Sequence, residues 1–485
     1  MMKLSYKDLI FVPITLLVFA LGITLNYFAV GVIITLGFGV YTLFKPKNGL
    51  IILFMYLPLR PFLLEFNPDL KSIADIILFI ALVKVVYMYR KNWKSLFQFQ
   101  WFELAYFGFI LVGVISALIT GVSLTSIILQ TRSFILLYVM FYIIKRINVT
   151  KQDLIKLGWT IVVLTIIISI HGLIEKLSLR SVLLPESWEN MPLSATNRIR
   201  IYGLLGNPNS LALYMSFVFI IIMYLKNHVQ KNKYLILNIT LILAMGVFSL
   251  TFSRGTWGAF AITALLYIIL TKNWRFLKNL AISLVLGILL IALPVSGITT
   301  LVENTDFGVG QREVQKEYDQ TDGNFSDRMR QTFDQSTIEG SMDSGRLFII
   351  QKGFQVFKDH PIIGTGFGTF GDSSTLSQGS PIYETYDIGL DFYSDNQYIQ
   401  IIVQTGIIGT ILFAIFLLHM LYLTWKHGRG SNYGILVFCL LLGSYVICMV
   451  YNAWESDIFT LFYFSFLGYL VNEKFREKVN QHAIE

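Results

Sequence analysis

Six arginines map to the outer ends of apolar runs or to the loops that join them. They are Arg60, Arg132, Arg198, Arg200, Arg254 and Arg346. A guanidinium group offers a rigid fork of N–H donors that fits phosphate or carboxylate oxygens. Because charges are costly at membrane depth, such residues line cavities or meet partners. The arginines indicate an anionic ligand, with a lipid-linked pyrophosphate as the leading candidate. The alternative is that each pairs with a local carboxylate or a lipid headgroup.

Other ionisable residues fall inside the apolar runs, mostly near their ends. A side chain there can extend to the aqueous interface, and this position is expected to account for Asp75, Lys84, Glu103, Glu175, Glu455 and Asp457. His171 and His419 are expected to be packing histidines. No H-x-x-H, H-E-x-x-H or C-x-x-C spacing occurs, so the sequence predicts neither a protein-built metal site nor a cofactor.

The elements that must position these residues are membrane helices. Of 485 residues, 55 % are apolar and 14 % are charged, whereas a soluble domain carries about 25 % charged residues. This composition excludes a disordered chain, a secreted disulfide scaffold and a cytosolic enzyme. Cys439 and Cys448 share one apolar run and are predicted to be small buried residues. The predicted fold class is an all-α polytopic integral membrane protein.

Fourteen stretches are predicted to span the bilayer, each with roughly the 20 mostly apolar residues that a spanning helix needs. They lie near residues 9–25, 27–44, 49–65, 73–89, 102–120, 124–144, 154–177, 208–225, 234–252, 256–271, 279–298, 397–424, 433–451 and 455–472. Pro58 and Pro61 predict a break or kink in the third stretch, because proline lacks the backbone donor.

Lys and Arg gather in every second connection, which places those connections and both termini in the cytoplasm. Two long segments, 178–207 and 301–395, then lie outside. The second holds 7 Lys+Arg against 16 Asp+Glu, a net charge of −9, while the rest of the chain carries +17. The predicted domains are an N-terminal bundle with the first outer loop (1–207), core helices (208–300), a large extracytoplasmic loop (301–395), and C-terminal helices with a cytoplasmic tail (396–485).

The large outer loop contains a predicted helix and a glycine-rich turn. Asp343 and Ser344 can cap a helix from about residue 345 to 359, which is expected to lie on the outer leaflet. Its lipid-facing residues would be Leu347, Ile350, Phe354 and Phe357. Gly366-Phe-Gly368-Thr-Phe-Gly371 matches G-x-G-x-x-G, but a helical stretch precedes it where a dinucleotide site needs a strand. We therefore predict a tight turn near the membrane surface.

Several ordered pieces of the sequence resemble the O-antigen ligase and polymerase superfamily. They are Arg200-Ile-Tyr-Gly-Leu-Leu-Gly-Asn-Pro-Asn209, Thr251-Phe-Ser-Arg254-Gly255, Gly345-Arg346-Leu347, His360-Pro-Ile-Ile-Gly364-Thr-Gly366, Asp395-Asn396 and Gly406-Ile-Ile-Gly409. The resemblance covers about residues 200–410, and the first two hundred residues add only a matching pattern of spans. It implies a metal-independent glycosyltransferase that acts on an undecaprenyl-diphosphate-linked glycan at the outer leaflet of the plasma membrane.

The resemblance also implies which residues bind the donor. The family's diphosphate-binding arginines correspond to Arg254 and Arg346, with Arg200 as a weaker match. Arg132 joins them as a further outward-facing arginine. Fixed guanidinium groups would stabilise the charge that grows on the diphosphate leaving group.

On the acceptor side, the sequence departs from the family. Where the ligases carry a histidine that acts on the acceptor hydroxyl, this chain has Asp395, which fits a polymerase better than a ligase. Asp395 is the candidate base, and its alternative role is the N-cap of the following helix. Asn396, Gly364 and Gly366 are the other residues assigned to acceptor contact or the supporting turn.

Three functions stay open on the sequence. The first is polymerisation of lipid-linked repeat units into a surface polysaccharide, the second is ligation to a lipid, wall or protein acceptor, and the third is transport or flipping. The expected partners are the lipid-linked glycan donor, a glycan or lipid-linked glycan acceptor, membrane lipids and other polysaccharide-assembly proteins. No nucleic acid partner is expected.

Overall fold

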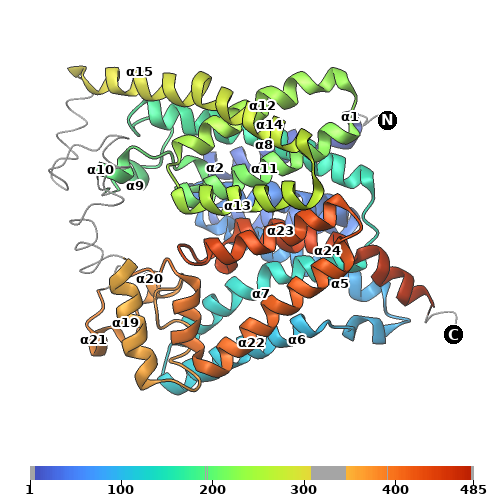
Figure 1. Cartoon of the computed structure of the whole chain (residues 1–485), viewed down its shortest axis with the longest axis vertical. Helices are drawn as coiled ribbons and strands as arrows, with labels where there is room; N and C mark the ends of the chain where they lie inside the picture. Colours follow the sequence, from blue (N-terminus) through green and yellow to red (C-terminus); the bar gives the residue numbers. More distant parts are fainter. Residues whose placement is uncertain (1–5, 192, 194, 307–345, 390–391, 482–485) are drawn as a thin grey trace. The chain divides into compact units, whose positions relative to one another are not determined.

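The structure is a computed structural model that describes residues 6–191, 193, 195–306, 346–389 and 392–481. The predicted cap at Asp343 and Ser344 lies outside these residues. Helices are the regular elements of the described chain, and no strand occurs in it (Figure 1). The all-α prediction is confirmed for this part of the protein.

A helical stretch lies at every predicted span, with ends that differ by a few residues. These stretches are α2 (Phe11–Thr24), α3 (Phe28–Phe44), α4 (Pro46–Phe66), α5 (Ile73–Met88), α6 (Trp101–Thr120), α7 (Leu124–Arg146), α8 (Lys151–Leu177), α11 (Pro208–His228), α12 (Tyr234–Leu250), α13 (Arg254–Thr271), α14 (Trp274–Gly287) continuing through η5 (Ile288–Ala292) into α15 (Leu293–Glu303), α22 (Gln397–Gly428), α23 (Asn432–Ile447) and α24 (Asp457–Gln481). In the described residues, nine helices are long and apolar enough to cross a membrane. The multi-pass class is therefore supported, while the number fourteen is not confirmed.

Of the break or kink predicted at Pro58 and Pro61, the break does not occur, and the kink stays a prediction. Both prolines lie inside α4, which runs as one helix from Pro46 to Phe66. Residues 50–59 of this helix are all buried, so tertiary packing on its flanks holds the helical path where the backbone lacks two donors. Cys439 and Cys448 are free and buried, as predicted.

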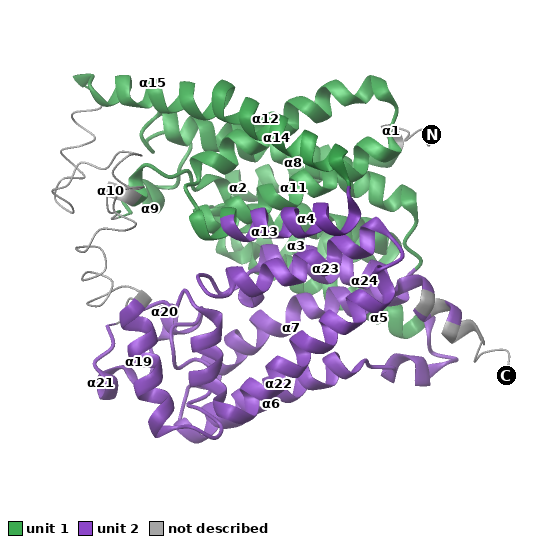
Figure 2. Cartoon of the chain, in the orientation of Figure 1, with its two compact units in different colours: residues 1–87, 148–257, 273–329 green, residues 88–147, 258–272, 330–485 purple. Residues whose placement is uncertain are grey.

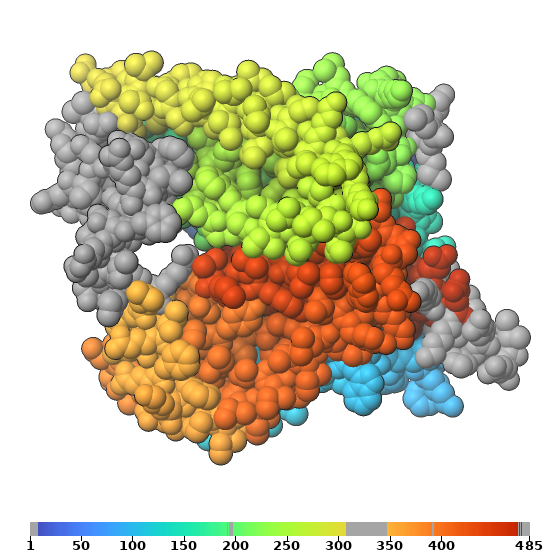
Figure 3. Space-filling model, in the orientation of Figure 1, coloured from blue at the N-terminus to red at the C-terminus, as the bar shows by residue number. Residues whose placement is uncertain are grey.

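The chain forms two compact units, each assembled from separate stretches of sequence (Figure 2). Unit 1 contains residues 1–87, 148–257 and 273–329. Within it, α12 packs against α8, α11 and α14. The run α14–η5–α15 has the least buried surface of the apolar helices, with 22 % of its most apolar window buried, and α15 is exposed on the face drawn in Figure 3 (yellow). An apolar helix with so little protein contact is suited to face lipid.

Unit 2 contains residues 88–147, 258–272 and 330–485. Its main helix pairs are α6 with α22 and α7 with α24 (Figure 1). The described outer loop also belongs here and includes α19 (Arg346–Asp359), α20 (Thr375–Gln378) and α21 (Tyr383–Tyr386). The predicted helix over 345–359 is thus confirmed within one residue.

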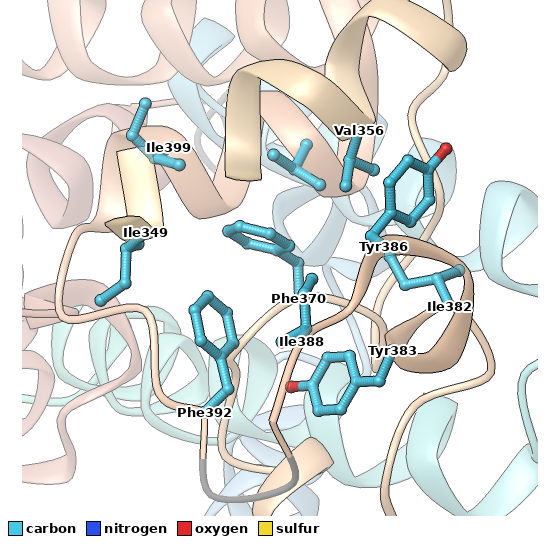
Figure 4. Packing of buried hydrophobic residues seen from close by; sticks show 10 residues of the cluster. Ile349, Val356, Phe370, Ile382, Tyr383, Tyr386, Ile388, Phe392 and Ile399 are labelled. Atoms are coloured by element: carbon cyan, nitrogen blue, oxygen red, sulfur yellow. The ribbon is translucent and has the colours of Figure 1, made fainter. Parts of the chain in front are cut away.

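An apolar cluster holds α19 to the loop and to α22 (Figure 4). Ile349 and Val356 of α19 are buried in it, and the rings of Phe370 and Phe392 stand 4.9 Å apart. Of the stripe assigned to lipid, Leu347 and Phe354 remain 44 % and 48 % exposed, whereas Ile350 packs against this cluster. The stripe is therefore only partly available to the outer leaflet.

Candidate functional site

Two of the family-like pieces meet in unit 1, although about fifty residues separate them in sequence. Arg200 donates from Nη2 to Asn209 Oδ1 at 2.8 Å and from Nε to the Thr251 carbonyl at 2.8 Å. Ser253 Oγ donates to the same Asn209 oxygen at 2.7 Å. We name Arg200, Asn209, Thr251, Ser253 and Arg254 the arginine junction.

Arg254 is the first residue of α13 and its side chain is exposed. Phe252, two residues earlier, has a φ of 48°, a strained value for an aromatic residue. This turn separates α12 from α13, and Ser253 is held there by Asn209. The first turn of α13 carries no acidic residue, so the positive end of the helix dipole favours an anion beside Arg254.

A buried ion pair anchors the segment that carries Arg200. Glu175 at the end of α8 accepts hydrogen bonds from Tyr202 N at 3.1 Å and Gly203 N at 2.6 Å, and pairs with Arg180. Arg180 also donates to the Trp188 carbonyl at 3.1 Å. The expectation that Glu175 extends to the interface is wrong, because its carboxylate has three protein donors and is 1 % exposed.

Glu103 and Glu455 correct the same expectation in unit 2. Glu103 is fully buried, pairs with Lys145 at 2.8 Å and accepts from Tyr138 Oη at 2.5 Å. Glu455 is 9 % exposed and lies among glutamine side chains. Sequence position alone missed both, since a residue near the end of an apolar run can point either to water or to another helix.

The predicted turn over residues 366–371 has no regular helix, and the stretch that leads into it, residues 361–366, fills a break in α22. Gly406 has non-helical torsions inside this helix. The chain from Pro361 to Gly366 passes the break: Thr365 N and Gly366 N donate to the carbonyls of Val403 and Gln404, at 3.0 and 2.8 Å. Beyond the break, the amides of Ile407 and Ile408 donate to the carbonyls of Pro361 and Ile362. Two family-like pieces are therefore the two sides of one backbone junction.

Only glycine fits at two positions of this turn. Gly364 has a φ of 70°, and a Cβ there would lie 2.4 Å from the Val403 carbonyl oxygen. Gly366 has a φ of 92°, and its Cβ would lie 2.0 Å from the Ala117 nitrogen of α6. Both are buried, so their direct role in the structure is close backbone packing.

Asp395 and Asn396 have different positions at the start of α22. Asn396 is the N-cap, since its Oδ1 accepts from Ile399 N at 3.1 Å. The alternative that Asp395 caps this helix is therefore wrong. Asp395 is half-buried with a φ of 42°, a left-handed conformation that Asp tolerates better than most residues. Hydrogen bonds between Asn452 and Ser394, and between Gln397 N and the Cys448 carbonyl, tie this segment to the loop before α24.

Two buried carboxylates near this segment, Asp372 and Glu455, were not predicted as site residues from the sequence. Asp372 accepts from Gly368 N at 2.7 Å, from Ser374 N and Oγ at 3.0 and 2.8 Å, from Thr375 N at 3.0 Å and from Gln404. These hydrogen bonds connect the Asp372 carboxylate to residues 368–375 and to Gln404 of α22. Among the described residues, Glu455 accepts hydrogen bonds from the side chains of Ser373, Gln397 and Gln400. Burial raises the pKa of both carboxyls, and Asp372 adds to the rise at Glu455, which reaches about 7.

The other predicted residues fall as follows. Arg132 lies in the first half of α7 and is half-buried. Arg346 begins α19, and its side chain lies outside what the structure describes. Arg200 and Arg254 belong to unit 1, whereas Arg132, Arg346 and Asp395 belong to unit 2. In the described residues no group of three or more His, Cys, Asp or Glu side chains is placed to hold a metal ion; metal-independent chemistry stays a prediction.

Residues 239–414 match the family model described as O-Antigen ligase. The match begins in α12 and ends in α22, so it includes Arg254, the glycine-rich turn and Asp395. Together with the apolar helices, it defines a multi-pass membrane protein of the class that carries out O-antigen-ligase-type glycan transfer. The match supports the resemblance to the O-antigen ligase and polymerase superfamily over this part of the chain. No match to a curated protein is found.

Proposed function

We propose that the chain polymerises undecaprenyl-diphosphate-linked oligosaccharide repeat units into a cell-surface polysaccharide at the outer leaflet. The observation that carries the proposal is the arginine junction, which presents exposed Arg254 at the N-terminal end of α13. An exposed guanidinium at the positive end of a helix dipole is suited to a diphosphate. The O-antigen ligase match supports a glycan-transfer reaction at such a site.

The reaction breaks the bond between sugar C1 and the phosphate oxygen. The bonding electron pair leaves with the diphosphate, and a hydroxyl of the acceptor glycan attacks C1 and gives up its proton. Arg254 would stabilise the growing negative charge, because that charge is larger in the transition state than in the bound donor. Arg200 would add a second guanidinium, while the assignment of Arg346 and Arg132 to the same diphosphate rests on the sequence alone.

Asp395 would contact the acceptor. Its strained backbone next to a helix N-terminus is of the kind found at functional sites, and a carboxylate there can accept a hydrogen bond from a sugar hydroxyl. The aspartate at this position favours a polymerase, whereas the family ligases carry histidine. Ligation to a lipid, wall or protein acceptor is the second candidate, and flipping of the lipid-linked glycan is the third.

Analysis of surface glycan in a deletion strain separates these functions. Single repeat units left on the lipid carrier at the outer leaflet support a polymerase, and full-length polymer accumulating on the carrier supports a ligase. Repeat units retained at the cytoplasmic leaflet would contradict both and indicate a flippase. Complementation with the wild-type chain is the control.

The proposal also requires the outer loop to face the exterior and both termini to be cytoplasmic. In intact cells, an impermeant maleimide should label Gln378→Cys in α20 and spare Asn232→Cys before α12; both residues are exposed in the protein. The two native cysteines are buried and should contribute little background. Equal labelling at the two positions would contradict this topology.

A further inference from the structure

Glu455 lies in a cluster of side-chain amides within unit 2. It ends η7 (Ala453–Glu455), and its Oε1 accepts hydrogen bonds from Gln397 Nε2 at 3.3 Å and from Gln400 Nε2. Gln130 of α7 approaches the same carboxylate from a second helix and favours its ionised form. We name Glu455, Gln130, Gln397 and Gln400 the amide cluster. The three glutamines are fully buried.

The two oxygens of the Glu455 carboxylate have different surroundings. Two amides hold Oε1, whereas Oε2 receives a long hydrogen bond of 3.4 Å from Ser373 Oγ. Ser373 is exposed, and its hydroxyl also stands 3.4 Å from Gln130 Oε1. A buried carboxylate oxygen is thus one hydroxyl away from the protein surface.

The Gln130 amide, which faces the Glu455 carboxylate, supplies a second feature of this cluster. Its Nε2 is buried and has no hydrogen-bond partner that meets normal geometry among the described residues. Buried amide donors are nearly always paired, and an unpaired one calls for a ligand or a water. A hydroxyl group can accept a hydrogen bond from Gln130 Nε2 and donate one to Glu455 Oε2 at the same time.

We propose that Glu455 is the catalytic base that takes the proton of the acceptor sugar hydroxyl, with Gln130 donating to the oxygen of that hydroxyl. This inference rests on the proposed function and assigns its proton-transfer step. As the hydroxyl oxygen bonds to C1, the C1–O bond to the diphosphate breaks and its electron pair leaves with the diphosphate. The hydroxyl proton moves to Glu455 Oε2 and later to solvent or to the released diphosphate.

The electrostatics suit this step. Burial, followed by the charge of Asp372, raises the pKa of Glu455 to about 7, and the three amides limit the rise. A base with this pKa is ionised in a large fraction of molecules at neutral pH and accepts a proton more strongly than an ordinary glutamate. Asp372 is a poorer candidate, because three backbone amides and two side chains already occupy its oxygens.

Tyr106 and Tyr393 are the other titratable groups near Glu455. Tyr106 lies in α6, and burial and Glu455 raise the pKa of the Tyr393 phenol, which stays neutral at working pH. Asp395 also raises the pKa of Tyr393, which places both carboxylates in the neighbourhood of one tyrosine. Asp395 can therefore orient the acceptor while Glu455 removes the proton.

The test uses full-length protein in lipid nanodiscs with purified lipid-linked repeat unit under single-turnover conditions. Glu455→Gln should lose about a hundredfold or more in rate with an unchanged KM for the donor, while Glu455→Asp should keep part of the activity. The matched control is Glu384→Gln, an exposed glutamate of α21, which should react like the wild type. Gln130→Ala should raise the KM for the acceptor about tenfold, the loss expected for one hydrogen bond.

The pH dependence of the wild type tests the inference without any variant. A general base works only when ionised, so the rate should fall as pH drops through about 7, the pKa of Glu455. The residual rate of Glu455→Gln should lack this acidic limb. A wild-type rate that stays constant between about pH 5.5 and 8.5 overturns the assignment. A folded Glu455→Gln variant with the wild-type rate also overturns it. Absence of product from the wild type itself overturns the proposed function.

Discussion

The arginine junction in unit 1 and the amide cluster in unit 2 differ in how far they expose their charged group. At the junction, hydrogen bonds organise the neighbours of Arg254 and leave this cation exposed. In the cluster, amides enclose the Glu455 carboxylate and leave one of its oxygens beneath an exposed serine. An exposed guanidinium keeps its charge and can bind an anion, whereas a buried carboxylate becomes a stronger base. Under the proposed function, the exposed guanidinium would serve the donor diphosphate and the buried carboxylate the acceptor hydroxyl.

Arg254 gives the largest expected effect and tests the donor half of the contrast. Arg254→Ala should lower the rate of product formation about 10²- to 10³-fold, because one fixed charge on the leaving group is lost. Arg254→Lys should recover only part, since an ammonium cannot make the forked contact. The measurement is turnover of lipid-linked repeat unit at matched protein level.

Arg275→Ala is the matched control for Arg254. This arginine is also exposed in the first turn of its helix, α14, but lies on the predicted cytoplasmic side. It should leave turnover unchanged. Wild-type polymer length and amount from Arg254→Ala would remove Arg254 from the donor site.

Glu175 separates support from chemistry in unit 1. Glu175→Gln breaks a buried ion pair with Arg180, which should destabilise the protein by about 3 kcal/mol and loosen the Arg200 segment. A lower melting temperature in detergent is expected, with turnover of the surviving folded protein reduced far less than by Arg254→Ala.

Glu65→Gln provides the comparison for that experiment. Glu65 is exposed and accepts a hydrogen bond from Ser187 Oγ. The melting temperature of the Glu65→Gln variant should therefore stay near the wild-type value. Equal melting temperatures for the two variants would show that the buried pair contributes nothing measurable.

Asp395 tests the acceptor half. Asp395→Asn keeps a side chain that tolerates the left-handed backbone but removes the charge, and should lower the rate about tenfold by weakening one charge-assisted hydrogen bond. Asp387→Asn is the control, because Asp387 has a similar φ of 51° and is exposed. A loss above a hundredfold that follows the Glu455→Gln pH profile would move the base to Asp395.

Removal of a helix cap should give the smallest effect, and the loss of stability should be equal in the two units. Asn207 Oδ1 accepts from Asn209 N and Ser210 N, and Asn396 Oδ1 accepts from Ile399 N. Replacing either by alanine should cost about 1 kcal/mol of stability, seen as a small shift of the melting temperature, and serine should restore it. A large loss of turnover from Asn396→Ala alone, with normal melting, would show that this cap also contacts the acceptor.

Local sequence features predicted the helices well and the ionisable residues poorly. The runs that became α7, α8 and α22 were recognisable from apolar length, and the helix at 346–359 from its pattern before Pro361. Position near the end of a run did not reveal that Glu175 pairs with Arg180 or that Glu455 meets Gln397 and Gln400. Hydropathy predicts that a segment is buried in the membrane or the protein, but it does not predict which residue a given side chain contacts.

The sequence by itself determined the class of this protein, because no soluble fold can accommodate 55 % apolar and 14 % charged residues, and backbone in lipid must form helices. Its ordered pieces also indicated the superfamily. Only the tertiary structure decided that Asn209 meets Ser253, that residues 361–366 fill the break in α22, and that Glu455 joins amides from two helices. Those contacts join residues 38 or more positions apart. They depend on which helix faces pack together, which a one-dimensional hydrophobic pattern does not encode.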